Sequence, residues 1–531
     1  MSQEKVFLRY ASPSERRMIS REDLGFYSNI VVGATYETGR DAAADLQSLQ
    51  TFARPLKRCI EKFPYLKVVV RDASTEKPFF ERVTSLNPQA HLRIITHPAA
   101  GVAPAGGEEE EQWKEKLLES LVDEPNSIAT TPPWRVMVLP ISRTRCFVAF
   151  AYSHTIGDGP AALAFHRAFL DGLRQGSAAL EEAVEPTGPV AVPEFVLPDP
   201  FDMPGRLPVS WSFLLGPLLA ALLPKTVGGW LGLQAHAAKV EQATWTGSDV
   251  SLDPGPNRSC VRMFAVDEAR VSGAIRASRA HGAKLTGTFH QLVVRALSKH
   301  ITNQKAGGNF VSQTAISMRA SIGLPSEEWG NFASGCYGMH PAAAVVEKDE
   351  EQQDVTEERQ QQPFLPSPLS TSKSPSPLPA LMWANAASLS KTIAESAAQL
   401  QDQPLGLLRY APSIRNWIRG KVGGRRDCSY EVSNLTSFRS GGDDDENPAT
   451  PQQQPRQTAS RSCRITEMIF AQPGGVVSAP LAFNLVSVGG GPLVGTITWG
   501  RGALGVPVEA EDALVDGIRR SLLDDFASIG N

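Results

Sequence analysis

The chain has 531 residues, of which 42% are hydrophobic and 20% charged, which suits a soluble globular protein with two or three cores. Its 52 Lys and Arg residues and 56 Asp and Glu residues give a net charge of −4, and without a basic domain this argues against nucleic acid as a partner. The six cysteines form no CxxC pair, which argues against a disulfide scaffold or structural zinc site and favours a reducing compartment. The polar N-terminal run lacks the apolar core of a signal peptide, so we expect a cytoplasmic protein, and a monomer.

Apolar periodicity predicts that helices and strands alternate along residues 1–175, which we take as an N-terminal half. The mixture indicates an α/β fold. The predicted helices cover 41–60, 112–121 and 161–173, and the predicted strands cover 66–70, 134–139 and 146–152.

Residues 176–255 form a Pro- and Gly-rich crossover that contains an uncharged apolar segment, 207–224. Its 18 residues reach the lower limit for a membrane span, but Pro217 would break a helix near its middle. Our main interpretation is a buried hairpin or channel wall. The alternatives are a peripheral membrane contact, at the endoplasmic reticulum or a lipid droplet, and a true span.

Residues 256–531 read as a C-terminal half of the same mixed character. Two polar stretches in it, 347–379 and 440–460, hold too few apolar side chains to offset the entropy of ordering, and we expect disordered surface insertions there. The predicted strands are 260–266, 314–318, 483–488 and 493–499, and the predicted helices are 268–281, 286–299, 380–400 and 510–523.

The sharpest local feature is the run HTIGDG at residues 154–159, between a predicted strand and a predicted helix. Such a corner can present side chains to a cleft while the scaffold holds them still. His154 suits proton transfer near neutral pH. The alternative is structural, with Asp158 as the N-cap of the next helix and His154 as a buried, hydrogen-bonded histidine.

The pattern H-x-x-x-D-G after a strand resembles the signature of the chloramphenicol acetyltransferase-like acyltransferases, a superfamily that includes plant BAHD enzymes and condensation domains. The run SREDLGFY at 20–27, continued by VVGATY at 31–36, resembles fungal alcohol acetyltransferases more narrowly. Further pieces follow in the family's order: PWR at 133–135, ISMR at 316–319, GNF at 330–332 and SNL at 433–435.

Two positions depart from the family pattern. Condensation domains carry two adjacent histidines, and here the first is Ser153. The BAHD motif DFGWG is absent, and Thr436 stands after Ser433-Asn434-Leu435 where the family usually has glycine.

The resemblance implies two α/β halves forming a V-shaped pair around a substrate tunnel. His154 would act as the general base for transfer of an acyl group, with acetyl-CoA as the expected co-substrate, to a small-molecule alcohol in fungal secondary metabolism. Asp158 and Gly159 would support the motif, with Asp158 paired to Arg319 of the second half. Asn331, Ser433 and Asn434 are candidates for lining the tunnel or stabilising the oxyanion.

The residues leave other activities open. The same base serves an amine acceptor, so an N-acyltransferase is the main alternative, and a thiolation domain could replace free CoA as the donor. A non-catalytic binding member of the fold is the third. We expect no bound cofactor and no metal, because the other histidines lack metal-ligand spacing.

Overall fold

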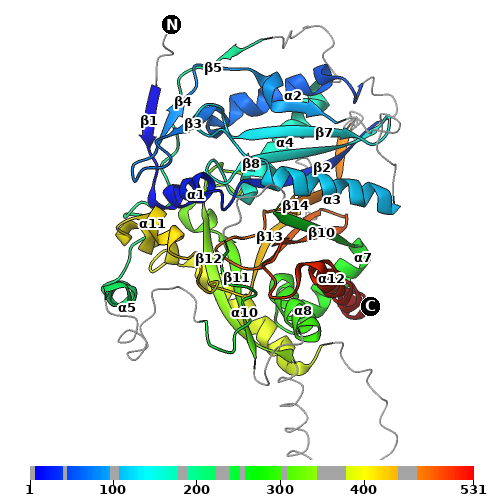
Figure 1. The fold of residues 1–531 in the computed structure, drawn as a ribbon. Coiled ribbons are helices and arrows are strands. Elements are labelled where there is room, and N and C mark those ends of the chain that lie inside the picture. The colour runs from blue at the N-terminus through cyan, green and yellow to red at the C-terminus, as the bar shows by residue number, and fades with distance from the viewer. Residues whose placement is uncertain are drawn as a thin grey trace, which may run out of the picture.

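The computed structural model describes residues 6–39, 45–95, 107–176, 188–222, 240–251, 258–301, 308–343, 378–439 and 463–530. Figure 1 shows the first half of the chain above the second, with one large sheet in each. The predicted insertion 440–460 lies outside the described residues. So does the predicted insertion 347–379, except for residues 378 and 379, where Leu378 is buried in the second core.

The main sheet of the first half has five strands in the order β14-β2-β8-β7-β6. The pairs are antiparallel except β6 with β7. Strand β14 comes from the far end of the chain, so the predicted C-terminal half, 256–531, lends a strand to the first sheet. The strands are β2 (Asn29–Thr38), β6 (Leu92–Ile94), β7 (Trp134–Pro140), β8 (Arg145–Ser153) and β14 (Cys463–Ala471).

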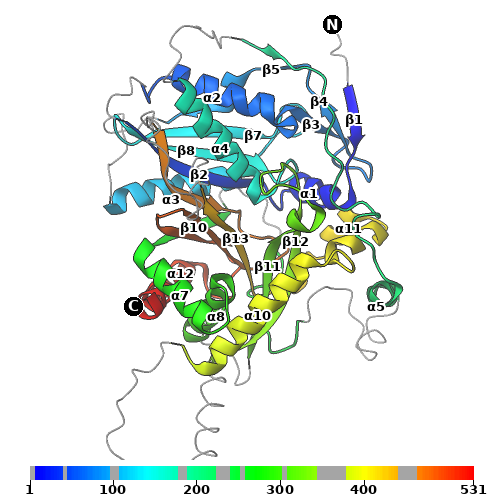
Figure 2. The same cartoon turned by 180° about the vertical axis from the view of Figure 1, so that it is seen from behind.

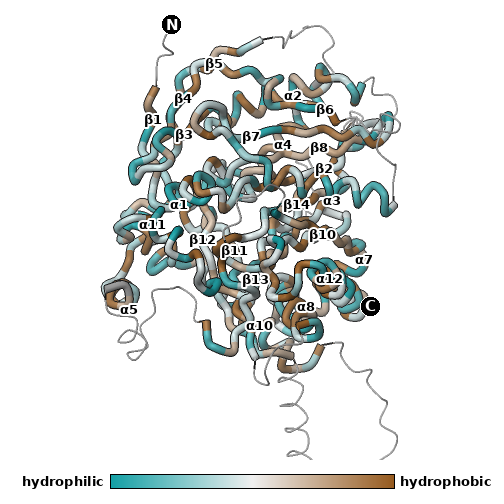
Figure 3. The backbone as a smooth tube through the Cα atoms, viewed as in Figure 1, coloured by the Kyte–Doolittle hydropathy of each residue, from teal (hydrophilic) through white to brown (hydrophobic). Residues whose placement is uncertain are grey.

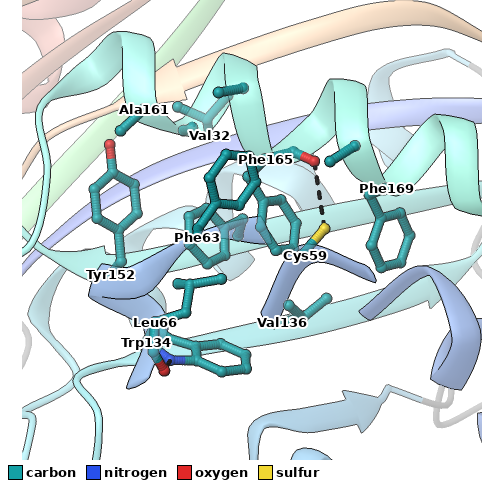
Figure 4. Close-up of a cluster of buried hydrophobic side chains, with 14 of the residues drawn as sticks. Val32, Cys59, Phe63, Leu66, Trp134, Val136, Tyr152, Ala161, Phe165 and Phe169 are labelled. Carbon is teal, nitrogen blue, oxygen red and sulfur yellow. Dashed lines mark hydrogen bonds between the residues drawn. The ribbon is translucent and has the colours of Figure 1, made fainter. Parts of the chain in front are cut away.

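Helices α2 and α4 cover one face of this sheet, as Figure 2 shows from behind. The rings of Phe165 and Phe169 on α4 pack toward Val136 and Trp134 of β7 (Figure 4). Each buried phenylalanine contributes roughly 1.5–3 kcal/mol to folding. This apolar layer fixes where α4 begins, and so holds the corner at residues 154–158. The helices are α2 (Leu49–Lys62) and α4 (Gly159–Gly176).

Smaller elements complete the first half. Strands β1, β4 and β3 form a separate three-stranded antiparallel sheet, and β5 pairs with β9 of the crossover. The elements are β1 (Val6–Tyr10), α1 (Pro13–Asp23), η1 (Pro64–Lys67), β3 (Val68–Arg71), β4 (Phe79–Arg82), β5 (Ser85–Leu86), η2 (Pro88–His91), α3 (Gly107–Asp123) and β9 (Val190–Ala191).

The second half is a six-stranded sheet in the order β10-β16-β15-β13-β11-β12, packed against helices that include α7, α8 and α12. The strands are β10 (Ser259–Val266), β11 (Asn309–Ser317), β12 (Ala333–Pro341), β13 (Tyr430–Phe438), β15 (Leu481–Val488) and β16 (Leu493–Gly500). The helices are α7 (Glu268–Ala280), α8 (Leu285–His300), η3 (Ala320–Ile322), α10 (Ala380–Ala398), η4 (Pro404–Tyr410), α11 (Ile414–Arg419) and α12 (Val508–Gly530).

Helix α3 joins the two halves through its acidic side chains. Strand β10 is an edge strand of the second sheet, and its outward N–H groups need partners. Four residues advance about 6 Å along a helix and two residues about 7 Å along a strand, so acids at every fourth helix position match alternate strand residues. The pairs are Glu115 with the backbone nitrogen of Met263, Glu119 with that of Val261 and Asp123 with that of Ser259, at 2.6, 3.0 and 2.7 Å.

The apolar segment 207–224 contradicts our main interpretation. Residues Trp211–Leu222 form one helix, α5, which continues through Pro217 and is not the expected buried hairpin; residues 223 and 224 lie outside the described ranges. The helix lies at the edge of the molecule in Figure 1, and its Trp211 is 75% exposed. Figure 3 shows that hydrophobic residues also line the buried strands β7 and β8, so apolar sequence alone does not separate these two environments. No helix within the described ranges is long and apolar enough to cross a membrane.

Candidate active site

His154 lies in the short connection between β8, which ends at Ser153, and α4, which begins at Gly159. Its imidazole is partly buried, and its ring centroid lies 5.7 Å from that of Tyr27, two residues before β2. The buried sheet fixes one end of the connection and the aromatic layer under α4 fixes the other. The corner therefore presents His154 on rigid supports at the seam between the halves.

Asn331 sets the tautomer of His154. Its side-chain nitrogen donates to the backbone carbonyls of His154 and Thr155, at 3.0 and 3.3 Å, so its oxygen is the atom that faces the imidazole. That oxygen lies 3.0 Å from Nδ1 of His154 and can only accept. Nδ1 therefore carries the proton, and Nε2 keeps a free lone pair. Since its amide hydrogens are already engaged, Asn331 contacts the histidine and is not a free oxyanion donor.

Burial, together with the smaller effect of the nearby cation Arg21, lowers the pKa of His154 from 6.5 to about 4. A neutral imidazole loses less solvation than an imidazolium, and a neighbouring positive charge opposes protonation. His154 is therefore neutral across the physiological pH range and can accept a proton at Nε2.

Asp158 points away from His154 and is paired with Arg319, which follows β11 and a single residue, Met318. Two guanidinium nitrogens donate to its two carboxylate oxygens, at 2.9 and 2.6 Å, and both side chains are 2–3% exposed. The backbone nitrogen of Phe332 also donates to Asp158, at 2.9 Å. The carboxylate thus ties the corner of the first half to the loop that carries Asn331.

The glycines of the motif permit close packing. A Cβ on Gly159 would lie 2.4 Å from a methyl carbon of Leu435, a side chain of the second half. A Cβ on Gly157 would lie 3.1 Å from the indole nitrogen of Trp329, which donates to the Ile156 carbonyl. The halves therefore meet directly over the corner.

The candidates on β13 point in opposite directions, because side chains alternate along a strand. Ser433 shares a face with Leu435, which contacts the corner at Gly159. Asn434 is on the other face, where its amide donates to Thr286 of α8 at 3.1 Å. We therefore keep Ser433 as a site candidate and do not assign Asn434 to the site.

The departure at position 436 keeps the turn that glycine would favour. Thr436 has φ of +63°, in the left-handed region, and its backbone nitrogen donates to the side-chain oxygen of Asn434 at 2.8 Å. This contact helps to hold a threonine in a conformation that costs a non-glycine residue free energy.

Sequence reasoning missed Glu22, near the end of α1. Its carboxylate accepts hydrogen bonds from the hydroxyls of Ser153 and Thr155, the residues on either side of His154, and from the amide of Asn126. Burial raises its pKa from 4.5 to about 7, against the effect of these donors. No sequence spacing relates position 22 to position 153.

Arg21 also went unpredicted. It is 6% exposed, its guanidinium carbon lies 4.5 Å from the centre of the Tyr27 ring, and its Nε has no hydrogen-bond partner within the described residues. Burial lowers its pKa to about 10. Among the charged groups, Arg21 has the largest effect on the pKa of His154.

A cavity of about 220 Å³ opens at the seam between the halves and is lined by Tyr27, whose ring neighbours His154. The buried Arg426 faces it, held by the carbonyls of Gly475 and Val476, each 2.7 Å from one guanidinium nitrogen. Arg258, Arg501, Asp123 and Asp249 also line it.

Two curated proteins are similar in sequence to this chain. The chain is 23% identical over 433 residues to the probable alcohol acetyltransferase crmB of Aspergillus fumigatus, covering 78% of this chain and 81% of that protein. It is 21% identical over 550 residues to the probable alcohol acetyltransferase FCK4 of Fusarium pseudograminearum, covering 99% and 96%. No family model matches.

Solved structures decide the fold. The TRI3 trichothecene 15-O-acetyltransferase of Fusarium sporotrichioides superposes with a TM-score of 0.58 at 12% identity, covering 99% of this chain and 95% of that one. The first condensation domain of the calcium-dependent antibiotic synthetase gives 0.54 at 12% identity, covering 100% and 98%. The chain has the chloramphenicol acetyltransferase-like fold. The predicted resemblance and the predicted α/β fold of this superfamily are confirmed, and the comparisons support the prediction of an acyltransferase enzyme.

Other histidines of this chloramphenicol acetyltransferase-like chain have structural partners. His166 lies between the Tyr36 hydroxyl and the Val32 carbonyl, 2.9 Å from each, and His290 lies near the hydroxyls of Tyr430 and Thr314, at 3.1 and 3.0 Å. All six cysteines are buried and free, and burial raises the pKa of thiols such as Cys59 and Cys146. Within the described ranges no group of three or more His, Cys, Asp or Glu residues could hold a metal ion.

Proposed function

We propose that this protein is an acyl-CoA-dependent O-acyltransferase that transfers an acetyl group from acetyl-CoA to an alcohol, with His154 as the general base. The observation that carries the proposal is the contact between Asn331 and Nδ1 of His154, which leaves Nε2 as a neutral acceptor at the seam between the halves. The likeness to proteins named probable alcohol acetyltransferases supports the choice of acetyl donor and alcohol acceptor.

In this mechanism Nε2 of His154 removes the proton of the acceptor hydroxyl as its oxygen attacks the thioester carbonyl. The tetrahedral intermediate then expels CoA thiolate as the C–S bond breaks, and the imidazolium returns the proton to sulfur. The products are the ester and free CoA. A pKa of about 4 keeps His154 available but weakens it as a base, so positioning and oxyanion stabilisation must supply the larger share of the rate.

The supporting residues take separate roles in this proposal. Asp158 and Arg319 hold the corner, Gly159 admits Leu435, and Asn331 orients the imidazole. Ser433 is our remaining candidate for the oxyanion donor, since its face of β13 is turned toward the corner. An amine acceptor would use the same base, so N-acylation stays the alternative.

The tunnel expected between the V-shaped halves would pass the cavity near Tyr27. Arginine is well suited to bind phosphate, and Arg426 with Arg258 and Arg501 would attract the phosphates of CoA there. The cavity of about 220 Å³ is small for a whole cofactor-sized ligand, so it would hold only part of CoA.

Helix α5 supports a peripheral membrane contact for a cytoplasmic enzyme. Its exposed apolar residues are Trp211, Leu215, Leu218 and Leu219, and exposed contiguous apolar surface marks sites of interaction. Co-sedimentation with phosphatidylcholine vesicles, compared between the full chain and a variant with Trp211 and Leu215 changed to Ser, would test it. Equal sedimentation of the two would contradict the contact.

The decisive assay measures thiol release from acetyl-CoA with a panel of alcohols and amines, together with mass spectrometry of the products. Thiol release that requires an alcohol supports O-acylation, and release that requires an amine supports the alternative. His154→Ala should fold normally and lower turnover by about 100-fold to 10,000-fold. Retention of more than about a tenth of wild-type turnover would rule out the general-base role. No turnover with any acceptor would favour a binding protein of this fold.

A further inference from the structure

The side of the corner opposite Arg319 is held by Glu22. Its Oε2 accepts hydrogen bonds from the Ser153 and Thr155 hydroxyls, the latter at 3.1 Å, so one oxygen grips the chain on both sides of His154. The Ser153 hydroxyl oxygen in turn accepts from the backbone nitrogen of Thr155 at 3.0 Å. Glu22, Ser153 and Thr155 are thus linked to one another by hydrogen bonds around His154.

Helix stability does not account for an acid at this place. Glu22 is the second-last residue of α1, where the helix dipole disfavours a negative charge. The N-terminus of the helix is already stabilised by the capping box of Ser12 and Glu15. The contacts of Glu22 are instead with β8, the corner and the loop before β7, so its role lies in the site.

The partners of Glu22 are neutral. Asn126 donates to its Oε1 at 2.8 Å, and the same amide nitrogen donates to Asn29 at 2.7 Å. Arg135 of β7, whose positive charge lowers the pKa of Glu22 through space, makes its own contacts with Asn126, to which it donates at 2.5 Å, and with Glu124, at 2.7 Å.

The other charges around Glu22 have partners elsewhere. Asp23, beside it on α1, pairs with Arg415 of α11, and Arg21 is turned toward Tyr27. Within the part of the chain that the structure describes, the Glu22 carboxylate therefore has no directly bonded cation, which makes its ionisation sensitive to its surroundings in the site.

We propose that Glu22 is a positioning residue for His154, whose ionised carboxylate holds the Ser153 and Thr155 hydroxyls and so fixes the imidazole for proton transfer. This inference rests on the proposed function of His154. It has a consequence for pH dependence: the pKa of Glu22 is raised to about 7 and that of His154 is lowered to about 4, both by burial. A change in activity near neutral pH would ordinarily be explained by the titration of a histidine. Here we expect it to report the titration of Glu22.

The test compares wild type, Glu22→Gln and the matched control Asp23→Asn, which removes the neighbouring acid of the same helix. The measurement is kcat/KM for acetyl-CoA between pH 5 and 9, with an alcohol from the panel that supports turnover. Wild type and Asp23→Asn should lose activity below about pH 7. Glu22→Gln should lose that step and at pH 8 show kcat about tenfold lower with KM unchanged, because the carboxylate grip is weakened. A neutral step that persists in Glu22→Gln, or disappears equally in Asp23→Asn, would overturn the proposal.

A second measurement does not depend on catalysis. The ¹³Cε1 NMR signal of His154, assigned by its loss in His154→Ala, should move in a step near pH 7 as Glu22 titrates, apart from the protonation of the ring itself. Glu22→Gln should abolish the step, and its persistence would overturn the proposal. If Glu22→Gln is insoluble, Ser153→Ala replaces it: loss of a donor to the ionised carboxylate should move the step to higher pH, and an unmoved step would overturn the proposal. Failure of the proposed function shows separately, as full turnover by His154→Ala.

Discussion

Asp158 and Glu22 lie on the two sides of the corner that carries His154, and they differ in the charge of their partners. Asp158 meets the cation of Arg319 from the second half, at 2.6 and 2.9 Å. Among the described residues, the Glu22 carboxylate accepts from hydroxyl and amide donors of the first half and from no cation. The first contact joins the halves, and the second shapes the base within one of them. Of the two carboxylates near His154, Asp158 thus serves mainly the stability of the fold, and Glu22 serves the position of the base.

The largest expected effect comes from breaking the charged contact. Arg319→Met leaves a buried carboxylate without its cation, and Asp158→Asn leaves a buried cation, so each should cost about 3–5 kcal/mol of unfolding free energy. The double variant should cost less than the sum of the two. Denaturant unfolding of the four proteins measures this. Additive effects, or a nearly neutral Asp158→Asn, would instead support an ordinary N-cap, because asparagine caps about as well as aspartate.

The next largest effect is expected from a negative charge placed beside Nδ1 of His154, at the position of Asn331. Asn331→Asp keeps an oxygen near Nδ1 of His154 and adds a negative charge, so the pKa of His154 should rise above about 4. In a Glu22→Gln background, where the step near pH 7 is absent, the low-pH limit of kcat/KM should move upward accordingly. Asn331→Ala, which removes the acceptor, should lower kcat without raising this pKa. An unmoved low-pH limit in Asn331→Asp would contradict the tautomer assigned here.

Smaller again is the contribution of Glu22 to the pH dependence of stability. With its pKa raised from 4.5 to about 7, the folded protein binds a proton that the unfolded chain has already released between these values. Stability should therefore fall as pH rises from about 4.5 to 7, since the folded state binds more protons there. Glu22→Gln should remove that part of the slope, which unfolding titrations at several pH values would detect. An equal slope in both proteins would contradict the raised pKa.

The elements that could be predicted, in both halves, are those that carry clear periodic patterns. The predicted strand 146–152 and helix 161–173 lie within β8 and α4, and the predicted helix 268–281 differs from α7 by one residue at its end. The strands that were not predicted include β1, β2, β4 and β6 of the first half and β12, β13 and β14. The transfer of β14 to the first sheet is decided by pairing between residues more than 400 positions apart, and no local pattern encodes that.

The site shows the same division. His154, Asp158 and Gly159 lie in one short motif, and Arg319 followed from the family resemblance. Glu22 and Tyr27 reach the corner only through the tertiary fold. The direction of Asn434 depends on which face of β13 meets the first half, and the strand itself had not been predicted. The exposed helix α5 was misjudged because buried and exposed apolar segments have the same composition.

The smallest expected effect concerns the turn that follows Leu435, the residue that packs on Gly159 beside Asp158. Thr436 holds φ of +63°, where a side chain with a Cβ is strained by roughly 1–2 kcal/mol and glycine is not. Glycine also has more freedom in the unfolded chain, which offsets part of the gain. Thr436→Gly should therefore stabilise the protein by about 1 kcal/mol or less, while Thr436→Val should not. Thermal unfolding of the three proteins checks this. Glycine keeps the backbone contact to Asn434, so a glycine variant that is less stable than wild type would mean that the freedom of glycine in the unfolded chain outweighs the strain at Thr436.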